Sequence, residues 1–164
     1  MTDLIPTMTS DTTPSGVVTS SGDYDSAHAA WKNFDDNSTT AWINVFTSFD
    51  PSYVWTQYKF ETSKAINKYS LTARQSEANA PSQWKLKASN TGAFAGEEVE
   101  LDSQSGQSFS SNEKKEYSFS NANKYLYYRI VFYITSAYIA VAEIEMEGPT
   151  HKTSGPIPMF FKTN

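Results

Sequence analysis

The sequence predicts an all-β protein, an antiparallel β-sandwich of about eight short strands. The first observation behind this prediction is composition: 15% of the residues are aromatic, and Ser and Thr are frequent, which is typical of strands. The second is alternation, which is clearest where Trp84, Leu86 and Ala88 are separated by Lys85 and Lys87. The third is the regular spacing of turn-forming residues between such runs. No repeat of 20–50 residues is visible.

The expected elements follow in chain order. Val17 and Val18 begin the first strand, and Asp25 with Ser26 is expected to cap a short helix. The strongest strand signal is residues 125–135, where apolar residues fall on one face. The other strands are expected at residues 54–60, 66–71, 84–88, 98–101, 117–119 and 142–146.

The chain of 164 residues suits one domain, expected at residues 15–148. Residues 1–14 and 149–164 are expected to be extended arms outside the core, although residues 7–16 can lie along the domain as an edge. The C-terminal arm ends in an apolar run, residues 157–161, which is expected to pack on this domain, on a second copy or in a larger assembly.

The net charge, the apolar runs and the cysteine content limit the partners and the setting expected for this protein. The net charge is −5 and no basic cluster appears, which argues against nucleic acid and anionic membranes as partners. No apolar run approaches transmembrane length, and the N-terminus lacks the features of a signal peptide. The absence of cysteine fits a reducing compartment or a bacterial or viral origin.

Residues 33–42 are the most distinctive stretch, because Phe34 and Trp42 bracket a run of oxygen-bearing side chains. Calcium prefers six to eight oxygen ligands in a flexible cage, so this stretch is a candidate metal site. Sodium or a simple Asx turn can use the same residues. An EF-hand loop is excluded, because it needs Gly where Thr40 stands and Glu where Phe46 stands.

Several segments together resemble a known family. Residues 34–42, Phe-Asp-Asp-Asn-Ser-Thr-Thr-Ala-Trp, resemble the Phe-Asp-Gly-Asp-x-x-Thr-x-Trp signature of discoidin domains, also called coagulation factor five/eight C-type domains, and of family 32 carbohydrate-binding modules. Residues 55–60, 81–90, 127–130 and 142–146 resemble the family's later strands in the same order. The resemblance covers residues 15–148 and implies a jelly-roll, galactose-binding-like β-sandwich.

The resemblance also implies a structural calcium between residues 33–42 and the last strand. The position of the family's Gly is Asp36 here, and that of its second Asp is Asn37, which removes one negative charge. Such an ion would tie the first loop to the last strand in a chain without disulfides. The ligands carried over are the Asn33 carbonyl, the Asp35 carboxylate, Asn37, the carbonyl and hydroxyl of Thr40, and Glu143.

Sugar-binding relatives use an early His, an Arg followed by Asn, and a late aromatic residue. His28, Arg74, Asn79 and Tyr138 occupy comparable loops and are the implied sugar-binding residues. Three of them have a simpler interpretation: a helix residue with a satisfied ring for His28, a pair with Glu77 for Arg74, and a core position for Tyr138. A second candidate surface is the aromatic loop with Phe46, Phe49 and Tyr53, which loop packing alone would also explain.

Catalysis has little support, because no catalytic motif is present. Asp35 and Asp36 are adjacent and point apart in an extended chain, unlike a paired acid and base. The sequence therefore favours a non-catalytic carbohydrate-binding module that binds a glycan, with a phage or bacterial surface structure as the suggested setting. The alternative is an assembly protein that makes a homo-oligomer or larger structure through residues 1–14 and 150–164.

Overall fold

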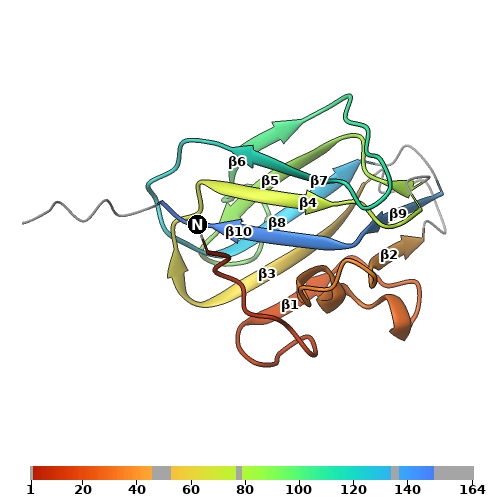
Figure 1. Cartoon of the computed structure of the whole chain (residues 1–164). Helices are drawn as coiled ribbons and strands as arrows, with labels where there is room; N and C mark the ends of the chain where they lie inside the picture. Colours follow the sequence, from red (N-terminus) through yellow and green to blue (C-terminus); the bar gives the residue numbers. More distant parts are fainter. Residues whose placement is uncertain (1, 46–52, 77–78, 134–136, 150–164) are drawn as a thin grey trace, which may run out of the picture.

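The computed structural model describes residues 2–45, 53–76, 79–133 and 137–149 (Figure 1). Nearly all regular structure in these residues is β, and every strand pairing is antiparallel. The predicted antiparallel β-sandwich is therefore confirmed. No helix in the described part of the chain is long and apolar enough to cross a bilayer.

Ten strands and two short 3-10 helices make up the described fold. The helices are η1 (Ser26–His28) and η2 (Ala30–Phe34). The strands are β1 (Val17–Ser20), β2 (Trp42–Val45), β3 (Tyr53–Lys64), β4 (Lys68–Thr72), β5 (Trp84–Ser89), β6 (Val99–Gln104), β7 (Lys114–Ser118), β8 (Tyr125–Tyr133), β9 (Tyr138–Val141) and β10 (Glu143–Glu147).

The strands form three antiparallel sheets. A five-stranded sheet has the order β1-β3-β8-β5-β6, a three-stranded sheet has the order β10-β4-β7, and β2 pairs with β9. Figure 1 shows β4 and β10 laid across the five-stranded sheet, with β2 and β9 together at one end of the sandwich. The loops at that end are therefore brought side by side by strand pairing.

The core lies between the two larger sheets and is rich in aromatic rings. Trp84 of β5 donates its indole N–H to the hydroxyl of Tyr69 of β4 over 2.8 Å, and both side chains are fully buried. That hydroxyl donates in turn to Asp102 of β6 over 2.7 Å, so no polar end of the pair is left without a partner. Alternation predicted the buried faces of β5 and β8 correctly: Trp84, Leu86, Ala88, Tyr128, Ile130 and Phe132 are buried.

The N-terminal segment lies against the sandwich, and part of it belongs to the core. Ile5 and Met8 are 4% and 1% exposed, which corrects the expectation that residues 1–14 are outside the core. The reason is backbone pairing: Leu4 donates to the Met146 carbonyl over 2.9 Å and Met8 to the Phe34 carbonyl over 2.7 Å. These bonds carry the two apolar side chains inward. Residues 150–164, the rest of the expected C-terminal arm, lie outside the described residues.

Two strands were not predicted. β2 begins at Trp42, which the sequence placed at the end of a loop, and β9 falls between the strands expected at residues 125–135 and 142–146. Both are short, and they pair with each other from Trp42 opposite Val141 to Val45 opposite Tyr138. Strands of four residues that pair across a long sequence separation leave too few alternations to be recognised locally.

Candidate functional site

The first candidate site is the corner where residues 33–42 meet the start of β10. The backbone N–H of Asn37 donates to the Glu143 carboxylate over 2.7 Å and to Asp35 Oδ1 over 3.1 Å. The Thr40 hydroxyl lies 2.8–2.9 Å from both Asp35 oxygens and 2.8 Å from the Asn37 carbonyl. The structure thus brings Asp35, Asn37, Thr40 and Glu143 together, as the sequence suggested.

This corner has more acceptors than donors. The single hydroxyl hydrogen of Thr40 can serve only one of its three oxygen neighbours. Glu143 Oε2 is buried and has no hydrogen-bond partner among the described residues. Such an excess of lone pairs is what a hard cation would satisfy, so the donor set fits calcium or sodium.

Glu143 is buried, only 6% exposed, and its surroundings disfavour the charged form. Burial is the larger cause and the nearby Asp35 carboxyl the next; together they raise the pKa of Glu143 to about 9, against the opposing effect of the Asn37 N–H. A bound cation would act in the opposite direction, because it favours the ionised carboxylate.

The two asparagines of the corner differ in whether their side-chain polar atoms already have hydrogen-bond partners. Asn33 is fully buried, and both polar atoms of its side chain lack partners in the described structure. Asn37 Oδ1 accepts from the N–H and the hydroxyl of Thr39, so the Asx turn that the sequence left open is present. No group of three His, Asp or Glu side chains gathers anywhere in the described residues, so neutral oxygens must complete a metal site here.

Asp36 occupies the position where the family has Gly, and it has a φ of 54°. This left-handed conformation favours Gly, and Asp tolerates it better than most residues. Its carboxylate accepts a hydrogen bond from the Thr7 hydroxyl, which ties the corner to the N-terminal segment.

The second candidate site is a surface cluster of three rings, which we call the tyrosine cluster: Tyr24, His28 and Tyr138. The Tyr24 ring centroid lies 5.8 Å from that of His28 and 6.3 Å from that of Tyr138, both in edge-to-face geometry. Tyr24 is 55% exposed and Tyr138 is 39% exposed. Tyr138 is therefore at the surface, which rules out the core position considered for it.

The tyrosine cluster is held by bonds from its own loops to β2. The Tyr24 N–H donates to the Ile43 carbonyl over 2.8 Å, and the Asn44 amide donates to the Gly22 carbonyl over 2.6 Å. Because β2 pairs with β9, the same strand also positions Tyr138. The loop is thus fixed before any ligand arrives, as a preformed site requires.

The His28 ring is oriented by Asp25. Its Nδ1 donates to Asp25 Oδ1 over 2.8 Å, so Nε2 of the neutral ring is an acceptor. This bond lowers the pKa of the Asp25 carboxyl below its ordinary value. The side chain of His28 remains 24% exposed, so its second nitrogen can reach a ligand hydroxyl.

The other two predicted sugar-binding residues lie on a neighbouring loop. Arg74 follows β4, whose last residue, Thr72, accepts from the Ala142 N–H beside the β9–β10 junction. The Arg74 carbonyl accepts from Asn112, so this loop is held by the turn before β7. Arg74 and Asn79 are both half-buried. Glu77, the suggested partner of Arg74, lies outside the described residues, as do Phe46 and Phe49.

Sequence reasoning did not select Tyr24 as a site residue. The signal was present: a single aromatic residue among Ser, Gly and Asp in a polar loop. An aromatic side chain in such a loop has no local apolar partner, so it is exposed unless another segment covers it. Only the pairing of β2 with β9 reveals that this tyrosine meets Tyr138.

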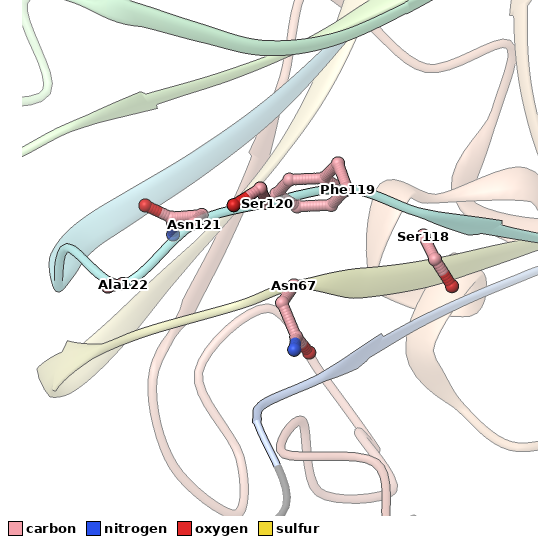
Figure 2. A pocket seen from close by; sticks show the side chains of 6 residues that line it. All are labelled: Asn67, Ser118, Phe119, Ser120, Asn121 and Ala122. Atoms are coloured by element: carbon pink, nitrogen blue, oxygen red, sulfur yellow. The ribbon is translucent and has the colours of Figure 1, made fainter.

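A hollow of about 550 Å³ at the opposite end of β4 is a weaker candidate. It is lined by Asn67 and residues 118–122. Figure 2 shows Asn67 and Ser118 pointing away from Phe119 and Asn121, so their polar groups do not converge. The side-chain amide of Asn121 already donates a hydrogen bond to the Ile66 carbonyl over 2.9 Å.

Comparison with solved structures places this architecture among known folds. A chitosan-binding module of a chitosanase/glucanase from Paenibacillus sp. IK-5 is 17% identical, with a TM-score of 0.70, covering 90% of this chain and 100% of that chain. A CBM32 module from Clostridium perfringens, in complex with GalNAc-β-1,3-galactose, is 16% identical, with a TM-score of 0.66, covering 80% and 94%.

The family 32 module of Clostridium perfringens NanJ, in complex with galactose, is 15% identical with a TM-score of 0.64, and the match covers 80% of this chain and 92% of that chain. No sequence-family model matches the chain, and no curated protein matches it at the level of sequence. These similarities confirm the expected fold: this chain shares its β-sandwich architecture with family 32 carbohydrate-binding modules.

Proposed function

We propose that the protein is a non-catalytic carbohydrate-binding module. The observation that carries this proposal is the tyrosine cluster, two exposed tyrosines and a histidine held together at the loop end of the sandwich. Aromatic faces suit the C–H side of a pyranose, and fixed polar atoms nearby suit its hydroxyls. Structural neighbours that bind galactose, GalNAc-β-1,3-galactose and chitotriose support a glycan as the ligand.

In this proposal Tyr24 and Tyr138 supply the stacking surface, and His28 accepts a sugar hydroxyl through Nε2. Asp25 is a positioning residue, because it fixes the histidine tautomer and touches no ligand. Arg74 and Asn79 extend the site on the neighbouring loop and contribute polar contacts to a second sugar unit.

A glycan-array screen of the protein, presented multivalently in calcium, tests this function. A defined hit is expected, and Tyr24→Ala and Tyr138→Ala should each weaken it by about tenfold or more, as truncation of a buried aromatic contact does. Val99→Ala is the matched control, because Val99 is similarly exposed at 43% on β6. A folded protein with no hit, or equal loss in the control, contradicts the proposal.

We also propose that Asp35, Asn37, Thr40 and Glu143, with Asn33, hold a structural calcium. The support is the excess of acceptor oxygens at this corner and the buried Glu143 Oε2, which has no partner among the described residues. The ion would supply the positive charge that the corner lacks and tie residues 33–42 to β10. It would have no part in chemistry on a sugar.

The proposed setting is display in several copies on a virion or bacterial surface structure. One small open site binds weakly, and multiple copies convert weak contacts into adhesion. The alternative, assembly through residues 1–14 and 150–164, predicts that trimming either segment changes the oligomeric state. Residues 5 and 8 are used by the domain itself, so the N-terminal segment is poorly suited to a partner.

A further inference from the structure

The outer face of the five-stranded sheet carries an arginine in an unusual environment. The Arg129 guanidinium of β8 lies between two aromatic rings, 3.9 Å from the Trp55 centroid and 3.8 Å from the Phe94 centroid. Its Nε donates to Gln57 Oε1 over 3.0 Å. The planar group is therefore fixed on both faces and on one edge.

Two lysines of β5 on this face have acidic partners. Lys85 pairs with Glu100 over 2.8 Å, and Lys87 pairs with Glu98 over 2.9 Å. No carboxylate within ion-pair distance accompanies Arg129 among the described residues. Burial lowers the pKa of its guanidinium below the ordinary value, so the charge is held in partly dehydrated surroundings.

The arginine lines a cavity of about 200 Å³. This is below the roughly 300–1,000 Å³ of pockets for drug-sized ligands, so it suits a single small unit. The charged lining residues, Arg129, Lys87 and Glu98, leave one net positive charge. Tyrosines at the ends of β3 and β8 complete the rim, and all members come from the described residues: Tyr53, Trp55, Lys87, Phe94, Glu98, Arg129, Val131 and Tyr133.

The loop that places Phe94 over Arg129 is held by its own hydrogen bonds. Glu97 accepts from the Ser89 and Thr91 hydroxyls over 2.8 and 2.7 Å, and from the Phe94 and Ala95 N–H groups over 3.0 and 2.8 Å. Phe94 has a φ of 50°, a left-handed conformation that is rare for an aromatic residue. The loop thus holds an unfavourable backbone conformation that places the ring on the guanidinium.

We propose that this cavity is a second ligand site, in which Arg129 binds the carboxylate of a single hexuronate unit while Tyr53 and Tyr133 contact its ring and hydroxyls. A guanidinium fork matches a carboxylate in shape and charge, and one that is already stacked and oriented loses little freedom on binding. The cavity shares none of its lining residues with the tyrosine cluster.

An NMR titration that follows the Arg129 Nε–H and the Trp55 indole N–H tests the ligand class. D-galacturonate is expected to shift both signals, and its methyl ester and D-galactose are expected to bind at least about tenfold more weakly, because they lack the carboxylate. Equal binding of the ester overturns the proposal. Acetate that binds as tightly as galacturonate overturns the role of the sugar ring.

Variants test the residue. Arg129→Gln and Arg129→Lys should each weaken galacturonate binding about tenfold to a hundredfold, since lysine keeps the charge and loses the fork and the stacking. Lys85→Gln is the matched control, because it removes a neighbouring cation that lies outside the cavity. Unchanged binding in both arginine variants, or equal loss in the control, overturns the assignment.

The test also separates this site from the proposed lectin-like function. Tyr138→Ala should leave galacturonate binding unchanged, whereas Arg129→Gln should leave binding of a neutral glycan unchanged. If galacturonate shifts signals of the tyrosine cluster and none at Arg129, the second site does not exist. If neutral glycans fail to bind and galacturonate still shifts Arg129, only the function of the tyrosine cluster is refuted.

Discussion

The carboxylates of Glu97 and Glu143 each organise a loop, but they accept very different numbers of hydrogen bonds. Glu97 accepts four hydrogen bonds from two hydroxyls and two backbone N–H groups within residues 89–95. Glu143 accepts one backbone N–H, that of Asn37, and lies beside a second carboxylate, Asp35. Hydrogen bonds from the loop lower the pKa of Glu97 far below its ordinary value, whereas burial raises that of Glu143.

The contrast shows which loop is complete without a ligand. A carboxylate whose lone pairs all meet donors can stay charged in place, and its loop needs nothing further. A buried carboxylate with one donor must either keep a proton or receive a cation. The 89–98 loop is therefore self-sufficient, and the 33–42 corner is the place where an ion would change stability.

The largest expected effect is that of calcium. Saturating calcium should raise the Tm of chelator-treated protein by about 5–10 °C, because an ion at 100-fold its Kd adds about 2.7 kcal/mol to a domain of this size. Differential scanning calorimetry with calcium and with chelator measures the shift. Glu143→Gln keeps the shape of the side chain and should abolish the response. If calcium leaves the Tm of the wild-type protein unchanged, the prediction is wrong and the 33–42 corner is stable without an ion.

The second effect concerns the complete loop. Glu97→Gln replaces one acceptor oxygen with a donor, and should lower the Tm equally with and without calcium. Because the folded pKa of Glu97 lies below the ordinary 4.5, its contribution to stability is present above pH 4.5 and is lost as the pH falls further. Hydrogen exchange at the Phe94 and Ala95 amides reports the loss directly. Calcium-dependent destabilisation by this variant would erase the distinction between the two loops.

Asp3 is an intermediate case, with two backbone donors, Ile5 and Met146. Burial nevertheless raises its pKa to about 6. A raised folded pKa means that its contribution is full below pH 3.8 and is lost as the pH rises through 6. Asp3→Asn keeps the acceptor and removes the charge, so it should stabilise the protein at pH 8. The full pKa shift corresponds to about 3 kcal/mol, and the partial exposure of the side chain reduces the expected gain to about 1–2 kcal/mol. Chemical denaturation at pH 8 and pH 4 checks this, and the gain should shrink at pH 4.

The smallest effect is expected at Asp36, an exposed acid beside the corner. Asp36→Asn tolerates the left-handed conformation and removes one negative charge, so it should stabilise the calcium-free protein by a few tenths of a kcal/mol. In the presence of calcium the gain in stability should vanish or reverse, because the negative charge of Asp36 attracts the bound cation. Thermal melts under both conditions decide this, and a gain that is equal in both would show that the charge of Asp36 does not act on the corner.

The sequence predicted the features that depend on contiguous residues and missed those that form between distant strands. Residues 33–42 and Glu143 were recognisable, because the loop is contiguous and its pattern resembles a known signature. The buried faces of β5 and β8 followed from alternation. Of the tyrosine cluster, the sequence indicated His28 and Tyr138 but not Tyr24. Tyr24 is brought to Tyr138 by the pairing of two four-residue strands, which the sequence did not predict. The Arg129 cavity was not found at all, because Trp55, Phe94 and Arg129 are far apart in the chain and meet only across the sheet.

The short link between β9 and β10 has a consequence for how the protein would behave in changing surroundings. Tyr138 begins β9, Glu143 begins β10, and Ala142 alone separates the two strands. With sugar and calcium bound as proposed, the two ligands act on one short piece of chain, and any factor by which one tightens the other must be reciprocal. Attachment would then follow the local calcium concentration, and a surface covered with such modules would detach when the ion is diluted, without any competing sugar.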